Sequence, residues 1–355
     1  MYGDISARDL LILAVRERVS DVFITAGSPV MFKKDGAIRA VSNFRMMPND
    51  TSRLIEEIFT FSTSQSYEEY LKTGDCDFSC SLSGVGRFRI NAFRQRNSLS
   101  AVIRVVQLTL ADPFEIGIPE AVISLCNKTR GMILVTGPAG SGKTTTLACL
   151  VNLINQHRNC HILTLEDPIE YLHIHKRSIV NQREMECDST GYSKALRAAL
   201  RQSPDVILVG EMRDLETTSI ALTAAETGHL VLSSLHTIGA AKTIDRILDV
   251  FPPSQQHQVR IQLSTVLQAV ISQQLLPSAT HGRKGVFEVM MVNPAIRNLI
   301  REAKTHQIDT AIHAGANEGM QTMDYSIAKA VKEGAVSKDD AFTYCVNPDV
   351  LSKYL

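Results

Sequence analysis

Nine consecutive residues near the middle of the chain have the types and spacing needed to hold a triphosphate. They are Gly137, Pro138, Ala139, Gly140, Ser141, Gly142, Lys143, Thr144 and Thr145. The three glycines let backbone N–H groups converge on phosphate oxygens, and a helix that starts here adds the positive end of its dipole. Lys143 can reach the outer phosphates, and Thr144 can ligate Mg2+. The segment is a complete Walker A motif and predicts binding of ATP with Mg2+; a glycine-rich turn without a ligand is the alternative.

The elements around this motif are those that a phosphate-binding loop requires. The apolar, β-branched run 132–136 predicts a buried strand that leads into the loop. After the loop, apolar side chains recur at the i, i+3, i+4 and i+7 positions of a helix. They are Leu147, Leu150, Val151 and Ile154. A strand, a glycine-rich turn and a helix therefore follow one another in the order that the motif needs.

Two further predicted strands end in acidic residues that suit phosphoryl transfer. One ends at Glu166, where the γ-phosphate and Mg2+ should lie. Strand 206–209 is followed by Gly210 and Glu211, which resembles a Walker B motif with glycine in place of the usual aspartate. Glutamate is ionised at neutral pH and can accept a proton from a positioned water. We predict Glu211 as the general base and expect Thr144 and Glu166 to ligate the metal; solvated carboxylates at strand ends are the alternative.

Two histidines bracket another apolar strand. His229 precedes and His236 follows the run 230–235. They are seven residues apart and have no cysteine or histidine at zinc-ligand spacing, so they do not predict a shared metal. We expect each to sense the γ-phosphate or to contact the other domain; packed core histidines are the alternative.

The N-terminal region carries a cluster of basic residues. Its members are Arg87, Arg89, Arg94, Arg96 and Arg104. An arginine supplied in trans accelerates phosphoryl transfer about a thousandfold or more. The cluster is therefore a candidate source of such an arginine; a solvated sheet face or a nucleic-acid surface is the alternative.

Bulk composition shows no strong electrostatic bias. The 355 residues contain 37 Lys plus Arg and 37 Asp plus Glu, so no overall field attracts nucleic acid or an anionic membrane. The seven cysteines have no paired spacing and no signal sequence is visible, which predicts a reduced, cytoplasmic protein. No apolar run approaches the roughly 20 residues of a membrane helix, so we expect membrane contact only through a partner.

The pattern of elements divides the chain into three parts. Residues 1–106 predict a mixed α+β domain, and the stretch 107–119, interrupted by proline and glycine, predicts a linker. In residues 120–355 strands and helices first alternate, which indicates a parallel sheet covered by helices, the RecA-like form of an α/β fold. After about Gly239 the pattern becomes mainly helical and includes a predicted long helix at about 255–272.

Several segments together resemble the motifs of the secretion ATPase superfamily. The sequences GPAGSGKTTT, HILTLEDPIEY, LRAALRQSPDVILVGEMRD and TAAETGHLVLSSLHT are similar to its Walker A, Asp box, Walker B and His box. A fifth segment, AIRNLIRE at 295–302, resembles a motif of the PilT family, the type IV pilus retraction ATPases. We expect the apolar side chains of this helix to pack inward and its polar side chains to couple hydrolysis to movement. The apolar positions are Ile296, Leu299 and Ile300, and the polar positions are Arg297, Asn298 and Arg301.

The resemblance implies a PAS-like N-terminal domain joined to a RecA-like ATPase domain with a helical C-terminal part, assembled as a homohexamer. It implies that ATP binds between the two domains and that hydrolysis powers pilus retraction and twitching motility. The expected partner is an inner-membrane pilus platform protein at the cytoplasmic face, with neither nucleic acid nor direct membrane insertion involved.

The resemblance also assigns roles by position. Lys143 and Thr144 carry over as phosphate and magnesium ligands. The other assigned residues are Glu166 as the Asp-box acid, Glu211 as the catalytic glutamate, His229 and His236 as the His box, and Arg89 and Arg104 as the N-terminal arginines. The segment Ser20–Thr25 departs from the family, because it reads SDVFIT where a Ser-Asp-Leu-His pattern is usual.

Other functions stay open at this point. An extension or secretion motor of the same superfamily usually carries a four-cysteine zinc motif, which this sequence lacks. A nucleic-acid motor is disfavoured by the balanced charge. An accessory retraction subunit or nucleotide-gated scaffold with weak ATPase is kept open by glycine at position 210.

Overall fold

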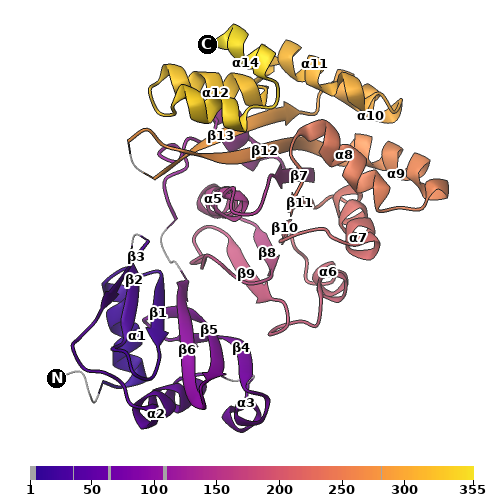
Figure 1. The fold of residues 1–355 in the computed structure, drawn as a ribbon. Helices are drawn as coiled ribbons and strands as arrows, with labels where there is room; N and C mark the ends of the chain where they lie inside the picture. Colours follow the sequence, from indigo (N-terminus) through magenta and orange to yellow (C-terminus); the bar gives the residue numbers. More distant parts are fainter. Residues whose placement is uncertain (1–4, 35, 63–64, 107–109, 281) are drawn as a thin grey trace. The chain divides into compact units, whose positions relative to one another are not determined.

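The computed structural model of the chain describes residues 5–34, 36–62, 65–106, 110–280 and 282–355 (Figure 1). It divides into two compact units. One contains Met1–Thr109 with Ile169–Leu172, and the other contains Leu110–Pro168 with His173–Leu355. Residues 107–109, which begin the predicted linker, lie outside the described residues.

The first unit is built on an antiparallel sheet of six strands in the order β3-β2-β1-β6-β5-β4. The strands are β1 (Asp21–Ile24), β2 (Met31–Lys34), β3 (Ala37–Ala40), β4 (Asp75–Leu82), β5 (Gly86–Gln95) and β6 (Ser98–Val106). The helices are α1 (Ala7–Arg16), α2 (Pro48–Phe59) and α3 (Tyr67–Thr73). Leu10 of α1 and Leu54 of α2 belong to the same buried cluster as Val22, Ile90 and Ile103 of the sheet. These two helices therefore cover one face of the sheet.

The opposite face of this sheet carries charged side chains. Arg89 of β5 lies opposite Arg104 of β6, which lies opposite Asp21 of β1. Successive residues of a strand point to opposite faces, so Arg89 and Arg104 point away from the face that α1 and α2 cover. The predicted basic cluster is only partly correct, because Arg94 instead donates to the carbonyl of Leu71 and Arg96 lies in the turn after β5.

The second unit contains a sheet of seven strands in the order β13-β12-β7-β11-β10-β8-β9. The strands are β7 (Gly131–Thr136), β8 (His161–Glu166), β9 (Ile179–Glu184), β10 (Val206–Val209), β11 (Leu230–Leu235), β12 (Leu267–Pro277) and β13 (Arg283–Met291). Neighbouring strands are parallel except for β13, which is antiparallel to β12. Parallel pairing brings the carboxyl ends of β7, β8, β10 and β11 to one edge of the sheet, where ligands of such folds bind.

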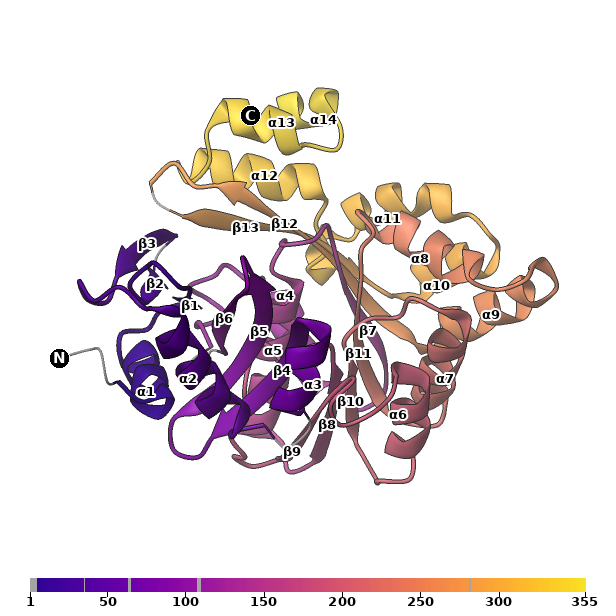
Figure 2. The same ribbon diagram turned by 60° about the horizontal axis from the view of Figure 1, so that its bottom comes forward.

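Helices cover both faces of this sheet (Figure 2). The helices of this unit are α4 (Glu120–Ser124), α5 (Lys143–His157), α6 (Tyr192–Ala199), α7 (Leu215–Glu226), α8 (Ala240–Asp249), α9 (Pro253–Val266), α10 (Pro294–Arg301), α11 (Ile308–Ala314), α12 (Met323–Lys332), α13 (Lys338–Tyr344) and α14 (Pro348–Tyr354), of which α4 to α11 cover the two faces. Alternate residues of β7 show the two layers. Ile133 and Val135 pack in the cluster of α4 and α5, whereas Met132 and Leu134 pack in the cluster of α6 to α11.

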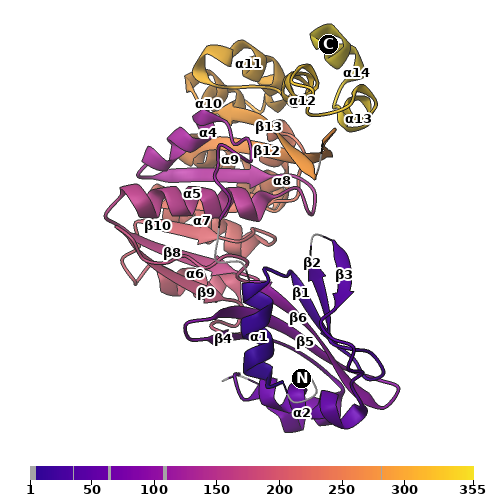
Figure 3. The ribbon, with the colours of Figure 1, turned by 90° about the vertical axis from the view of Figure 1, so that its left-hand side faces the viewer.

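The last three helices form a separate layer on the end of the β12–β13 hairpin (Figure 3). Leu276 of β12 and Val286 of β13 are buried together with Met323 and Ile327 of α12 and Leu351 of α14. The helical C-terminal part is thus anchored to the sheet through its two last strands. No helix in the described ranges is long and apolar enough to cross a membrane.

The expected fold class is confirmed: a RecA-like α/β unit follows an α+β unit and carries a helical C-terminal part. The predicted long helix at 255–272 is wrong in its last six residues. The helix ends at Val266, and residues from Leu267 onward form β12 between β7 and β13. The apolar run of this segment suits either a helix or a buried strand, and pairing with two neighbouring strands selects the strand.

Candidate active site

The predicted phosphate loop connects β7 to α5. It leaves β7 at Thr136 and enters α5 at Lys143. Gly137 and Gly142, at the two ends of the loop, have φ angles of 143° and 87°, a region that residues with a side chain rarely adopt. The first N–H groups of α5 have no partner within the helix and are available to an anion at this end.

Lys143 lies over the loop from the first position of α5. Its Nζ donates hydrogen bonds to the carbonyl oxygens of Gly137 and Pro138, each at 2.9 Å. The same ammonium lies 3.5 Å from Nδ1 of His236. The lysine is therefore already held at the mouth of the loop, beside the end of β11.

Glu211 lies at the carboxyl end of β10, in contact with two cationic or ionisable side chains. Its Oε2 is 3.6 Å from Nε2 of His236 and 2.5 Å from Nε of Arg213. The imidazole of His236 thus lies between the ammonium of Lys143 and the carboxylate of Glu211. Only 12% of the Glu211 side chain is exposed, compared with 73% for Arg213, so access to the carboxylate is restricted.

Glu166 is the last residue of β8 and is buried. Its Oε1 accepts hydrogen bonds from Oγ1 of Thr164 at 2.6 Å and from Nε2 of Gln182 at 3.1 Å. These bonds hold the carboxylate in one orientation at the same edge of the sheet as the phosphate loop.

The donor groups at this edge are those that Mg2+ prefers. Thr144 supplies a hydroxyl from the first turn of α5, and Glu166 supplies a carboxylate. Mg2+ is usually held by one or two such protein oxygens, and phosphate oxygens and waters complete its coordination. The residues present therefore fit this ion when a triphosphate is bound.

Tyr192 is a residue of this region that the sequence reasoning missed. A β-carbon at Gly210 would lie 2.7 Å from the Tyr192 hydroxyl oxygen. Burial raises the pKa of Tyr192, and the neighbouring carboxylates of Asp167, Glu211 and Glu166 raise it further. The hydroxyl therefore stays protonated among the acidic groups. No sequence signal marked it, because Tyr192 begins an ordinary amphipathic helix and only the packing of α6 brings it to Gly210.

His229 lies at the other end of β11. Leu230 pairs with Gly131 and Leu235 with Thr136, so His229 is at the edge of the sheet opposite the phosphate loop. Its Nδ1 lies 3.0 Å from the carbonyl of Ala224, at the end of α7. Within one chain His229 is therefore separated from the phosphate loop by the length of β11, and its expected role, as a γ-phosphate sensor or in contact with the other domain, stays a prediction.

Arg89 and Arg104 belong to the first unit. They are paired across β5 and β6 on its exposed face, and Nε of Arg104 donates to Oδ1 of Asp21 at 3.0 Å. Because Asp21 is buried and Arg104 is largely exposed, the ion pair anchors the guanidinium while leaving it accessible.

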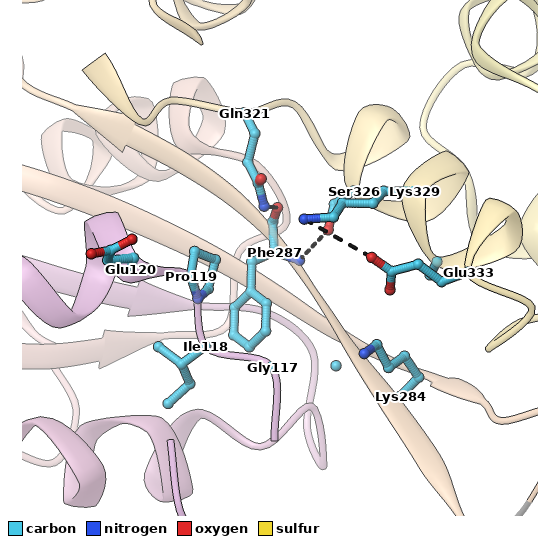
Figure 4. Close-up of a pocket in the computed structure, with 12 residues that line it drawn as sticks. Gly117, Ile118, Pro119, Glu120, Lys284, Phe287, Gln321, Ser326, Lys329 and Glu333 are labelled. Atoms are coloured by element: carbon cyan, nitrogen blue, oxygen red, sulfur yellow. Dashed lines mark hydrogen bonds and ion pairs between the residues drawn. The ribbon is translucent and has the colours of Figure 1, made fainter. Parts of the chain in front are cut away.

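A pocket of about 330 Å3 lies between the segment 117–120, β13 and α12 (Figure 4). Its wall contains the ion pair of Lys329 and Glu333, whose atoms are 4.0 Å apart, and Ser326, which accepts a hydrogen bond from the backbone N–H of Phe287. None of the predicted site residues lines this pocket.

The second unit has a glycine-rich loop with lysine and threonine after a buried strand, and two further strands of its RecA-like sheet end in acidic residues. These features define a P-loop nucleotide-binding protein.

Residues 6–343 match the family model described as Type II/IV secretion system protein. The chain is 46% identical over 333 residues to the type IV pilus retraction ATPase PilT of Pseudomonas aeruginosa, which covers 94% of this chain and 96% of that protein. It is 44% identical over 323 residues to a twitching motility protein of Neisseria gonorrhoeae, covering 91% and 86% of the two chains.

A solved structure agrees with these sequence comparisons. The crystal structure of the pilus retraction motor PilT with bound ADP matches with a TM-score of 0.90 and 44% identity, covering 99% of this chain and 100% of that one. The chain therefore belongs to the Type II/IV secretion system family and, within it, to the PilT family, as the sequence motifs predicted.

Proposed function

We propose that this protein is an ATP-hydrolysing motor that powers type IV pilus retraction and twitching motility. One observation carries the proposal: Lys143, His236 and Glu211 follow one another at the edge of the sheet where the phosphate loop lies. The PilT relatives, which match nearly the whole chain, support the same function.

The residues suit hydrolysis of the γ-phosphate. The N–H groups at the start of α5 and the ammonium of Lys143 hold the phosphate oxygens. Glu211 accepts a proton from a water whose oxygen attacks the γ-phosphorus, while the bond to the β–γ bridging oxygen breaks and ADP leaves. His236 lies close to both Lys143 and Glu211, which supports a role for it in sensing the γ-phosphate.

Mg2+ would be held by Thr144 and Glu166 together with the phosphates. When bound, the ion supplies positive charge that neutralises the phosphate oxygens. The hydrogen bonds to Glu166 from Thr164 and Gln182 keep its carboxylate in place for this role.

The proposed working form is a homohexamer that acts on an inner-membrane pilus platform protein from the cytoplasmic side. In this assembly Arg89 and Arg104 approach the nucleotide of a neighbouring subunit and stabilise the charge that develops during phosphoryl transfer. The ion pair of Arg104 with the buried Asp21 supports this role because it limits the positions of an otherwise exposed guanidinium.

Purified protein tests the proposal directly. With ATP and Mg2+ we expect a hexamer by light scattering and steady phosphate release at micromolar protein. Lys143→Ala should lose nucleotide binding, and Glu211→Gln should bind ATP but release phosphate at least about a hundredfold more slowly. A monomer that leaves ATP intact would exclude a motor.

A complementation experiment in cells distinguishes the retraction motor from the alternative functions. Expressed in a piliated bacterium without its retraction motor, the protein should restore retraction. Restored pilus assembly instead would indicate an extension motor. Turnover no faster than that of Glu211→Gln, with retraction only beside a second motor, would indicate an accessory subunit.

A further inference from the structure

We propose that Gln273 is a positioning residue of the nucleotide site, whose side chain fixes the phosphate loop against β12 and thereby sets nucleotide affinity without contacting the nucleotide. The proposal rests on the nucleotide site proposed above. It assigns a role to a residue that none of the sequence motifs includes.

Strand pairing brings Gln273 to the start of the loop. β12 runs parallel to β7, and the last pair of residues in register is Ser272 with Thr136. The next residues are Gln273 of β12 and Gly137, the first residue of the loop after β7. Gln273 is therefore the residue of β12 that lies where the backbone of β7 turns into the phosphate loop.

The side chain of Gln273 is tied to the helix that follows the loop. Its Oε1 accepts a hydrogen bond from Oγ1 of Thr146 at 2.7 Å. Thr146 belongs to the first turn of α5 and is fully buried, and only 4% of Gln273 is exposed. Loss of one partner would leave a buried polar group unpaired, which costs more than the bond itself contributes.

The same residue shapes both ends of the loop. A β-carbon at Gly142 would lie 2.8 Å from Nε2 of the Gln273 side chain, and one at Gly137 would lie 2.2 Å from the backbone carbonyl oxygen of Gln273. Both distances are too short for a real carbon atom. The first and last loop glycines thus allow close approach of Gln273, in addition to their positive φ angles.

These contacts act on the groups that bind phosphate. Lys143 and Thr144 lie between Gly142, where Gln273 leaves no room for a β-carbon, and Thr146, which donates to Gln273. Without the amide, the first turn of α5 can shift relative to β12, and its N–H groups lose their fixed direction toward the anion. The neighbours of Gln273 are residues of the loop and of α5, so it acts through these residues and not by contact with phosphate.

The chain contains a matched control on the same strand. Gln268 lies near the start of β12, and its Nε2 would be 2.7 Å from a β-carbon at Gly131, the first residue of β7. It is thus a glutamine of β12 packed on a glycine of β7, but at the edge of the sheet opposite the phosphate loop.

The first experiment compares Gln273→Leu with Gln268→Leu in the full-length protein. Binding of a fluorescent ADP analogue, kcat and KM for ATP, and the thermal midpoint are measured for each. We expect Gln273→Leu to weaken ADP binding about tenfold, as for loss of one buried hydrogen bond, and to raise KM more than it lowers kcat. Gln268→Leu should change the thermal midpoint but bind ADP as the parent does.

A double-mutant cycle then tests the bond itself. Thr146→Val should weaken ADP binding by a factor similar to that of Gln273→Leu, and the double variant should be no weaker than either alone. Thr146→Ser, which keeps the hydroxyl, should bind ADP more tightly than Thr146→Val.

Two results would overturn the positioning role while leaving the proposed function intact. One is folded Gln273→Leu protein that binds ADP with the parent's affinity. The other is a double variant whose loss of ADP affinity equals the product of the losses of the two single variants, which would show that the two side chains act independently. A parent protein that itself binds no ADP would overturn both the positioning role and the proposed function.

Discussion

The hydroxyl of Tyr192 occupies the space that a side chain at Gly210 would need. A β-carbon at Gly210 would lie 2.7 Å from the Tyr192 hydroxyl oxygen and 3.1 Å from the carbonyl oxygen of Leu165. The glycine that departs from the usual Walker B motif is thus required by the packing of α6 on β8 and β10. An aspartate cannot enter here without displacing the tyrosine.

The first prediction concerns this packing. Gly210→Ala should destabilise the protein by about 1–3 kcal/mol, as overpacked sites do. Gly191→Ala is the control, because open space surrounds Gly191. Thermal unfolding of both variants gives the comparison. Adding Tyr192→Phe to Gly210→Ala should recover part of the loss, and no recovery would show that the hydroxyl is not the obstacle.

The second prediction concerns His236, which lies 3.5 Å from Lys143 and 3.6 Å from Glu211. His236→Ala should lower kcat about tenfold while changing nucleotide affinity little, because the imidazole orients groups that act in the transition state. His306→Ala, at an exposed position, is the control. Steady-state kinetics with both variants would reject the role if kcat stayed at the parent value.

The third prediction separates the polar residues of the AIRNLIRE helix. Ile296 and Ile300 are fully buried, as expected. Arg297, however, donates hydrogen bonds to the carbonyls of Ser264 at 2.8 Å and Thr265 at 2.7 Å, near the end of α9. It satisfies carbonyls that a helix end leaves unpaired, so it has a structural role in addition to any role in coupling.

Arg297→Ala should therefore lower the free energy of unfolding by about 1–3 kcal/mol. Arg301→Ala should change it by less than about 0.5 kcal/mol, because Arg301 is exposed. Thermal unfolding and retraction assays on both variants test this difference. If Arg301→Ala keeps its ATPase but stops retraction, the coupling role belongs to the exposed positions of the helix.

The fourth prediction concerns pH and Glu288 on β13. Its Oε1 accepts a hydrogen bond from the backbone N–H of Ala240 at 2.7 Å. Burial raises the pKa of Glu288 to about 7, opposed by backbone hydrogen bonds from Ala240 and Met323 and assisted by the charges of Asp309 and Asp324. The unfolded chain ionises this group near 4.5, so the folded state binds the extra proton between these values.

The contribution of Glu288 to the free energy of unfolding is therefore fully present below about pH 4.5 and is lost as the pH rises through about 7. Relative to Glu288→Gln, which cannot ionise, the parent should lose up to about 3 kcal/mol across this window. Thermal midpoints of both proteins from pH 4.5 to 8 measure the difference. Parallel pH curves for the two proteins would contradict the assignment.

The sequence by itself determined the phosphate loop and the strand ends that carry the acids. The loop is a local structure, because adjacent glycines, Lys143 and Thr144 set the backbone and its charges within one turn. Glu166 and Glu211 follow apolar strands, and parallel strands bring their carboxyl ends to one edge, so periodicity alone predicts that they lie together.

Only the tertiary structure decided how distant segments meet. The run after Val266 suits a helix as well as a strand, and pairing with β7 and β13 makes it β12, which places Gln273 at the start of the phosphate loop. Strand direction likewise separates His229 from His236, although both flank β11. Such contacts depend on which strands become neighbours, and that choice is made by burial of the whole sheet and not by the residues next to each other in the chain.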